Sequence, residues 1–384
     1  MSNTDDLPVK QDNDSSARVP PRRRPGRLIK WLLPLGILAA LLAFAIWGGE
    51  DIGKPSPADE WKIVDYHDDG PGMDSGRYSD LDFVDGQHGW AVRMDRPGVI
   101  MGTTDGEHWE PVVQDGIQVD FATSTSGWLR GSATALARTT DGGLHWEVIP
   151  VEAEPPSDIR ALAAVSEAEC WLLTDSGRLL HTTDRGRHWV VVPHPLSDLV
   201  LEMVFFLDRQ HGWILAWEPQ RLCLLRTTDG GRSFASVVLP SVTTGTLSSG
   251  HIYFRTPREG WLAVGGPDLL HTTDGGETWQ RVRPLRDLLG NTAYNDCCFV
   301  TPREGWAVGK RGGSALAVHT RDGGRTWRRS YTGVETVKNS ELWRVVFVDR
   351  QHGWVTGEAG VIPSDLMPWK PGHQVTFLLR YGGD

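Results

Sequence analysis

The chain has 384 residues, of which 23% are charged, and a formal net charge of −10. This length allows a large buried core, and the negative charge disfavours nucleic acid as a partner. Four cysteines in a chain of this length are too few for a disulfide framework.

The first 59 residues contain three segments without any repeat. Residues 1–27 are polar, rich in proline and arginine and without periodicity, so we expect a disordered basic tail on the cytoplasmic side. Residues 28–49 include a long uncharged run, residues 31–49, which predicts a transmembrane helix. Residues 50–59 combine glycine, proline, serine and charge, as a linker does.

The charges around the apolar run predict its orientation. Basic residues precede it, and the acidic Glu50 and Asp51 follow it. The sequence therefore predicts a single-pass membrane protein whose N-terminus is cytoplasmic and whose globular part is periplasmic or extracellular. A cleaved signal peptide is the alternative, because Ala43-Phe44-Ala45 resembles a cleavage site.

Residues 60–384 carry a recurring turn phrase, Thr-x-Asp-x-Gly-x-x-Trp/Phe, for example from Thr272 to Trp279. It occurs six times, once shortened by one residue, with its aspartates at Asp105, Asp141, Asp184, Asp229, Asp274 and Asp322. Consecutive aspartates are 36–48 residues apart, and a recurrence of this kind indicates a repeat architecture. We expect each aspartate to accept backbone N–H bonds within a tight turn. Replacing Asp274 with alanine should then leave buried N–H groups unpaired, at a cost of about 1–3 kcal/mol.

A Gly-Trp pair, or a near copy of it, precedes each turn phrase. It occurs seven times, at Trp90, Trp128, Trp171, Trp213, Trp261, Trp306 and Trp354. A phenylalanine stands seven residues before each tryptophan, except for Ala164 in the third repeat, and another apolar residue stands two positions earlier. This period of two marks a buried strand. Seven repeats of about 46 residues predict an all-β fold, a seven-bladed β-propeller, behind the N-terminal transmembrane helix.

The two ends of the repeat region are complementary. The seventh repeat has no turn phrase after Trp354, whereas Trp61-Lys62-Ile63-Val64 looks like the strand that follows each turn. We therefore expect residues 61–66 to pair with residues 374–380 and to close the propeller, which would remove open sheet edges.

The turn phrases resemble Asp-box repeats, also called bacterial neuraminidase repeats. Their combination with Gly-Trp phrases, as in residues 301–309 followed by residues 319–324, is most similar to the photosystem II assembly and stability factor family. The resemblance covers residues 61–384. It implies a non-enzymatic propeller, held at a membrane, that acts as a binding scaffold or assembly factor for membrane proteins. It also implies that the six turn aspartates are structural, and that the partners are membrane-protein subunits or peptide segments.

A second set of residues lies ten or eleven positions before each Gly-Trp tryptophan. We expect this set to surround one mouth of the central channel and to form a mixed-charge ring where a peptide or loop docks. Its members are Asp80, Gln118, Arg160, Glu202, His251, Asp296 and Arg344. A solvated channel without a ligand is the structural alternative.

Other functions remain open at this point. A glycoside hydrolase or sialidase-like enzyme needs a pair of carboxylates, and Asp80, Asp82, Asp120, Glu202 and Asp296 all lie on predicted innermost strands. A receptor for peptides or glycans is the third possibility. No catalytic residue is assigned. Each turn phrase offers a single carboxylate of the pattern, so we expect no calcium and no cofactor. Among the cysteines, Cys170 and Cys223 are a possible disulfide between neighbouring repeats.

Overall fold

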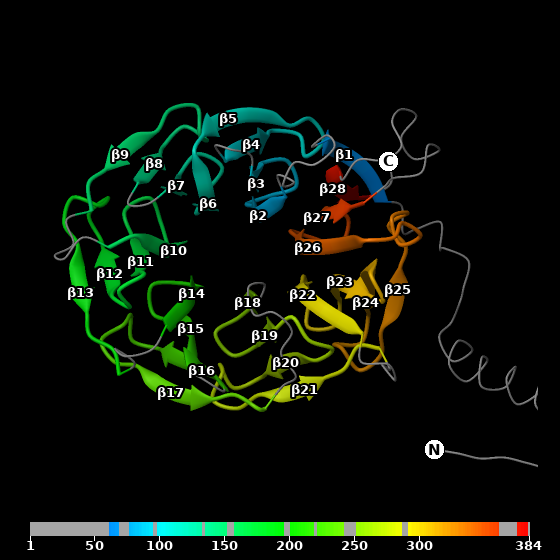
Figure 1. Cartoon of the computed structure of the whole chain (residues 1–384). Coiled ribbons are helices and arrows are strands. Elements are labelled where there is room, and N and C mark those ends of the chain that lie inside the picture. Colours follow the sequence, from blue (N-terminus) through cyan, green and yellow to red (C-terminus); the bar gives the residue numbers. More distant parts are fainter. Residues whose placement is uncertain are drawn as a thin grey trace, which may run out of the picture. The chain divides into compact units, whose positions relative to one another are not determined.

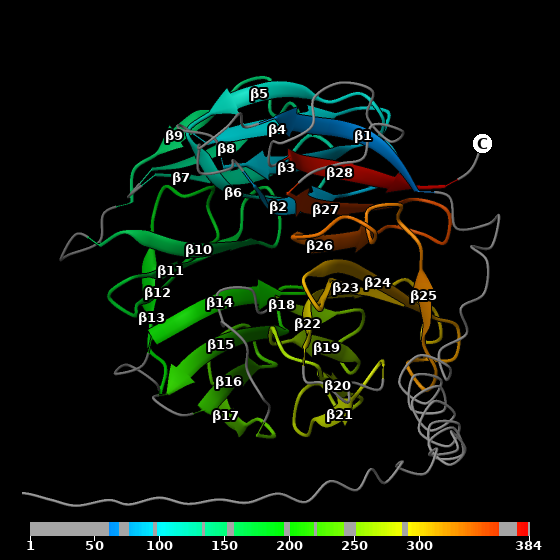
Figure 2. The same cartoon turned by 45° about the vertical axis from the view of Figure 1, so that its right-hand side comes forward.

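The structure is a computed structural model that describes residues 61–68, 77–94, 98–132, 135–151, 157–195, 200–218, 221–241, 251–285, 291–360 and 375–382. These residues form seven four-stranded antiparallel sheets, the blades of a β-propeller, which confirms the predicted all-β fold (Figure 1). Figure 2 shows the same sheets after a rotation. The predicted tail (1–27), transmembrane helix (28–49) and linker (50–59) lie outside the described residues. In the ranges that the structure describes, no helix has the length and apolarity to span a bilayer.

The first four blades follow the chain in order, and each begins at the innermost strand. Blade 1 contains β2 (Tyr78–Phe83), β3 (Gly89–Arg93), β4 (Val99–Thr103) and β5 (Glu110–Gln114). Blade 2 contains β6 (Gly116–Phe121), β7 (Gly127–Gly131), β8 (Leu136–Thr139) and β9 (Glu147–Ile149). Blade 3 contains β10 (Ile159–Ala164), β11 (Cys170–Thr174), β12 (Leu179–Thr182) and β13 (Val190–Val192). Blade 4 contains β14 (Val200–Phe206), β15 (Gly212–Glu218), β16 (Arg221–Thr227) and β17 (Ala235–Val238).

Blades 5 and 6 follow the same pattern, whereas blade 7 uses both ends of the propeller sequence. Blade 5 contains β18 (His251–Phe254), β19 (Gly260–Ala263), β20 (Leu269–Thr272) and β21 (Gln280–Val282). Blade 6 contains β22 (Thr292–Phe299), β23 (Gly305–Arg311), β24 (Ser314–Thr320) and β25 (Arg328–Ser330). Blade 7 contains β26 (Ser340–Phe347), β27 (Gly353–Ala359), β28 (Val375–Tyr381) and, as its outermost strand, β1 (Trp61–Asp68). β1 runs antiparallel to β28, from Trp61 opposite Tyr381 to Asp68 opposite Val375.

The tryptophans of the Gly-Trp pairs lie between blades and join each blade to the next. Each is 0–2% exposed, and six of them stack on the phenylalanine of the following blade. The six stacked pairs are Trp90–Phe121, Trp171–Phe206, Trp213–Phe254, Trp261–Phe299, Trp306–Phe347 and Trp354–Phe83. The core is therefore a series of clusters between neighbouring blades rather than one central mass.

Contacts within each blade explain why glycine precedes the tryptophan. A Cβ on Gly89 would overlap the ring of Phe83, and the same holds for Gly353 and Phe347. Blade 3 departs from both positions at once, because Cys170 replaces the glycine and Ala164 replaces the phenylalanine. The smaller Ala164 leaves the room that the Cys170 side chain occupies.

All four cysteines are buried, and none of them forms a disulfide in the structure. Cys170 and Cys223 belong to different apolar clusters, so the possible disulfide between them is not formed. The neighbouring Cys297 and Cys298 also face different clusters, as expected for adjacent residues of one strand.

Candidate functional site

Each turn phrase folds into the same hydrogen-bonded loop at the end of a blade's third strand. In blade 5, the hydroxyl of Thr272 accepts a hydrogen bond from the backbone N–H of Gly276 (2.9 Å) and donates one to the carboxylate of Asp274 (2.8 Å). Asp274 in turn accepts from the backbone N–H of Thr278 (2.9 Å). Gly275 and Gly276 both have positive φ, at 80° and 92°, which glycine tolerates best. The threonine and the aspartate therefore hold the loop together.

The buried donor of this loop is bound by the threonine, which the sequence analysis did not single out. Gly276 and Thr272 are buried, whereas Thr278 is exposed. The expected role of Asp274, binding buried N–H groups, therefore belongs to Thr272. The same arrangement occurs at Asp105, Asp141, Asp184, Asp229 and Asp322. Hydrogen bonds from His145 lower the pKa of Asp141 to about 2.

The residues predicted at the channel mouth lie on the innermost strands, but they do not share one register. β10 and β14 each carry a β-bulge, and Arg160 and Glu202 are the bulged residues. The positions equivalent to Asp80 in those strands are Ala161 and Met203, each opposite the residue two places after the Gly-Trp tryptophan. β2, β6, β22 and β26 carry a bulge at the same place, so the predicted set combines two positions: the residue ten before the tryptophan and the bulged residue, eleven before it. Arg160 binds Glu202 (2.7 Å) across the boundary of blades 3 and 4.

Polar side chains on the innermost strands clamp the next blade. Asp80 accepts a hydrogen bond from the backbone N–H of Val119 (3.3 Å), and Gln118 accepts one from Leu162 (3.1 Å). Asp296 accepts one from Val345 (3.0 Å). An innermost strand has no sheet partner on its channel side, so these acceptors satisfy backbone groups that would otherwise be open.

A second row of carboxylates, two residues further along, does the same. Asp82 accepts from the N–H of Phe121 (2.6 Å), and Asp120 accepts from Ala164 (2.9 Å). The side chains of Asp82 and Asp120 are half-buried, and most of their surroundings are protein. This burial raises the pKa of Asp82 to about 7, and it raises the pKa of Asp120 as well, with a further contribution from the charge of Asp82.

Arg344 and His251, which were also predicted at the channel mouth, compensate the negative charge of the neighbouring aspartates. Burial raises the pKa of Asp80, while the charges of Arg344 and His251 act in the opposite direction. The ring nitrogen Nδ1 of His251 lies 2.6 Å from the carboxylate of Asp296, which is 1% exposed. The mouth is thus a network of paired charges, and its members also hold neighbouring blades together.

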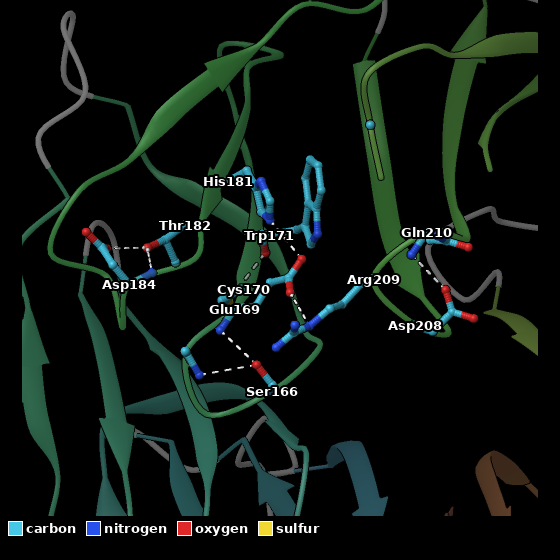
Figure 3. Close-up of polar contacts among 12 residues, drawn as sticks. Ser166, Glu169, Cys170, Trp171, His181, Thr182, Asp184, Asp208, Arg209 and Gln210 are labelled. Atoms are coloured by element: carbon cyan, nitrogen blue, oxygen red, sulfur yellow. Dashed lines mark hydrogen bonds and ion pairs between the residues drawn. The ribbon is translucent and has the colours of Figure 1, made fainter. Parts of the chain in front are cut away.

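A separate polar cluster lies between blades 3 and 4, and Figure 3 shows it in close-up. The carboxylate of Glu169, 6% exposed, lies 3.1 Å from Nε2 of His181 and 3.0 Å from Nε of Arg209. The ring of His181 stacks on Trp171, with ring centroids 3.8 Å apart. Burial lowers the pKa of His181, although Glu169 acts to raise it. Glu169 therefore fixes Arg209, whose side chain is 72% exposed, at the rim of the cluster.

The cluster lines one part of a cavity of about 530 Å³. Its lining consists of Glu169, His181, Thr183, Arg209, Gln210, Asp229, Gly230 and Arg232. Glu169 binds Arg209, and Asp229 is hydrogen-bonded within its turn, while the side chains of Arg209 and Arg232 are exposed to solvent. The arrangement suits a carboxylate ligand, because guanidinium groups bind carboxylates through paired hydrogen bonds.

Sequence reasoning missed the Glu–His pair of this cluster, although a repeated signal was present. A glutamate precedes the Gly-Trp pair, or its Cys-Trp copy, at Glu169, Glu259 and Glu304, and a histidine follows on the third strand at His181, His271 and His319. The structure brings each glutamate and histidine together, at 3.1, 3.6 and 3.2 Å.

In the described part of the chain, no group of three or more His, Cys, Asp or Glu side chains has the arrangement of a metal site.

Comparison with known proteins places the chain by both sequence and fold. The family model of the photosynthesis system II assembly factor YCF48 matches residues 58–189, 187–293 and 285–364. A solved structure of YCF48 bound to a D1 peptide is 23% identical, with a TM-score of 0.58, over 87% of this chain and 98% of that chain. YCF48 from Cyanidioschyzon merolae is 22% identical, with a TM-score of 0.59, over 83% and 98%.

More distant structures share the fold alone. The GH74 xyloglucanase from Xanthomonas campestris is 15% identical, with a TM-score of 0.56, over 78% of this chain and 53% of that chain. A search of curated proteins found no match.

Proposed function

Because the chain belongs to the photosynthesis system II assembly factor YCF48 family, we propose that it is a non-enzymatic scaffold that binds a peptide segment of a membrane-protein subunit during assembly. YCF48, a propeller of similar fold, has been solved bound to a D1 peptide, which supports a peptide ligand. The proposal concerns the kind of partner, a peptide segment, and does not require that this partner is D1.

The observation that carries the proposal is the cavity between blades 3 and 4. Its volume of about 530 Å³ accommodates several side chains of an extended segment. Arg209 is positioned by the buried Glu169 and does not need to be ordered when the ligand arrives. Such pre-organisation reduces the entropic cost of binding. We assign the docking of an acidic peptide segment to Arg209 and Arg232.

The inner carboxylates support binding over glycoside hydrolysis. Asp80, Asp82, Asp120 and Asp296 each accept a backbone N–H of the following blade. A hydrolase needs one carboxyl group to protonate the leaving oxygen and another to act on the sugar or on water. These four groups face backbone donors instead, so their geometry supports a structural role.

The location outside the cytoplasm, on a single-pass anchor, is likewise a proposal. It is supported by the uncharged run of residues 31–49, with basic residues before it and acidic residues after it. Alkaline phosphatase fused after residue 384 should be active in cells that express the full chain. An active cytoplasmic reporter at the same position would contradict this orientation.

Site-specific photocrosslinking tests the docking proposal. A photoreactive amino acid in place of Gln210, in the cavity, should capture a membrane-protein subunit in native membranes, and Arg209→Ala with Arg232→Ala should abolish the capture. The control position is Val238, which is 63% exposed on blade 4. The same probe in place of Arg344 examines the channel mouth. Capture from Arg344 but not from Gln210 would move the site to the mouth, and equal capture from Val238 would overturn the proposal.

A further inference from the structure

A second cavity, of about 630 Å³, lies between blades 6 and 7. It is lined by Asn291, Lys310, Gly312, Gly313, Asn339, Ser340, Glu341, Glu358 and Gly360. These residues belong to the starts of the innermost strands and to the connections between second and third strands. In an antiparallel blade those segments lie on the face opposite to the turn phrases. The cavity is therefore on the other side of the propeller from Arg209 and Arg232.

Two glutamates of this cavity are placed directly opposite each other. Glu341 on β26 pairs in register with Glu358 on β27. Like charges in this relationship destabilise a sheet. The fold does not require them, because the equivalent pair in blade 6 is Ala293 and Lys310. The like-charge pair is thus a feature of this cavity and not of the repeat.

The two carboxylates differ in how they are compensated. Glu341 is 8% exposed and binds the amide of Asn295 (2.8 Å) and the ammonium group of Lys310 (2.7 Å). Glu358 is only partly buried, and the nearby indole of Trp343 acts to lower the pKa of its carboxyl group. Burial and the charge of Glu341 raise the pKa of Glu358, which Arg77 and Lys310 offset only in part. A carboxylate in this position is better compensated when a further cation arrives.

We propose that the cavity between blades 6 and 7 binds a basic side chain, arginine or lysine, of a partner polypeptide, with Glu358 as its counter-charge. The amide oxygens of Asn291 and Asn339, which are exposed at the rim, supply further acceptors. The volume suits an organic cation rather than a bare metal ion. The inference does not depend on the acidic-peptide site, because the two cavities use different residues on opposite faces.

Binding of a labelled tri-arginine peptide to the full chain in detergent tests this proposal. We expect saturable binding at low salt, and no binding of a tri-glutamate peptide. Glu358→Gln should weaken tri-arginine binding at least about tenfold, because it removes a partly buried charge partner. Asn291→Arg, which places a guanidinium group of the chain's own at the rim, should also abolish binding. Glu110→Gln, a change at an exposed glutamate on blade 1, is the matched control and should bind like the wild type.

Thermal unfolding separates loss of the site from loss of the fold. Glu358→Gln removes the like-charge pair, so its Tm should rise by about 1–3 °C while binding is lost. The proposal is wrong if Glu358→Gln binds tri-arginine as the wild type does. It is also wrong if Glu110→Gln weakens binding equally, which would mean general attraction to an acidic protein only.

Discussion

Trp354 of the last blade stacks on Phe83 of the first blade, with ring centroids 3.5 Å apart and an interplanar angle of 11°. Its indole nitrogen also donates to the carbonyl of Gly106 in the first turn (2.9 Å). Consecutive blades are joined in the same way, since Trp213 stacks on Phe254 and donates to Gly275. The ring is therefore closed by a contact of the type that repeats along the chain.

Replacing Trp354 with alanine should open this closure. The indole is 0% exposed, so the change leaves a large cavity and should cost about 3–5 kcal/mol of unfolding free energy. Denaturant unfolding followed by tryptophan fluorescence measures the effect. Val148→Ala, at a side chain that is 75% exposed, is the control and should change stability by less than about 0.5 kcal/mol. A similar small change for Trp354→Ala would contradict the closure.

The turn phrases give a second prediction, in which threonine matters more than aspartate. Thr272→Val keeps the shape but leaves the buried N–H of Gly276 without its acceptor, at about 1–3 kcal/mol. Asp274→Ala removes an acceptor from Thr278, whose N–H water can solvate, so we expect about 0.5–1 kcal/mol. Thermal melts of both variants decide the order. A larger loss for Asp274→Ala would restore the role expected from the sequence.

Asp82 should make the stability depend on pH. Its pKa is raised to about 7 in the folded protein, so between about pH 4 and 7 the folded state keeps a proton that the unfolded state releases. Its contribution therefore falls as pH rises through this range. Asp82→Asn keeps an acceptor for Phe121 and should be more stable than the wild type by about 1–2 kcal/mol at pH 8, with little difference at pH 4. Equal pH profiles for the two proteins would show that Asp82 titrates normally.

The aspartates of the turns act in the opposite direction at lower pH. Hydrogen bonds hold the pKa of Asp184 and of Asp229 near 2, so their contribution is present above about pH 4 and is lost as the pH falls toward 2. The decline between pH 4 and 2 should persist in Asp82→Asn. This separates the two effects within one titration.

Thiol titration tests the burial of the cysteines. All four are buried thiols outside any disulfide, and burial raises the pKa of Cys170 and of Cys297. The native protein should therefore react very slowly with a thiol reagent such as Ellman's reagent at pH 8. Four thiols should react after unfolding without a reductant. Two reactive thiols in the unfolded protein would instead indicate a disulfide.

The blades were predictable because their signals recur. The apolar period of two, the Gly-Trp pair and the turn phrase each mark a local structure, and the seven copies of the Gly-Trp pair match the seven blades. Trp61 could be assigned to the last blade because it matches the tryptophan or phenylalanine that ends each turn phrase. Local patterns of this kind survive in a single sequence.

The polar sites were less predictable because they depend on register and on neighbours. Arg160 and Glu202 are the bulged residues of their strands, whereas Asp80 and Gln118 follow the bulge, so the spacing of ten or eleven residues combined two different positions. The carboxylates of Asp82 and Asp120 bind backbone N–H groups of the following blade, and no local pattern shows which donor an acceptor will meet. Likewise, Glu169 and Arg209 come from different blades, so their pairing appears only when the blades are packed.

The pairing of β1 with β28 also constrains the order of events during synthesis. Blades 1 to 6 are each built from consecutive residues, so they can form one after another as the polypeptide emerges. Blade 7 cannot be completed until residues 375–381 have left the ribosome, and the strand made first must wait for the strand made last. A nascent chain that stalls before residue 375 has an incomplete blade 7 with an unpaired strand edge. Chaperones bind surfaces of this kind, and aggregation begins at them.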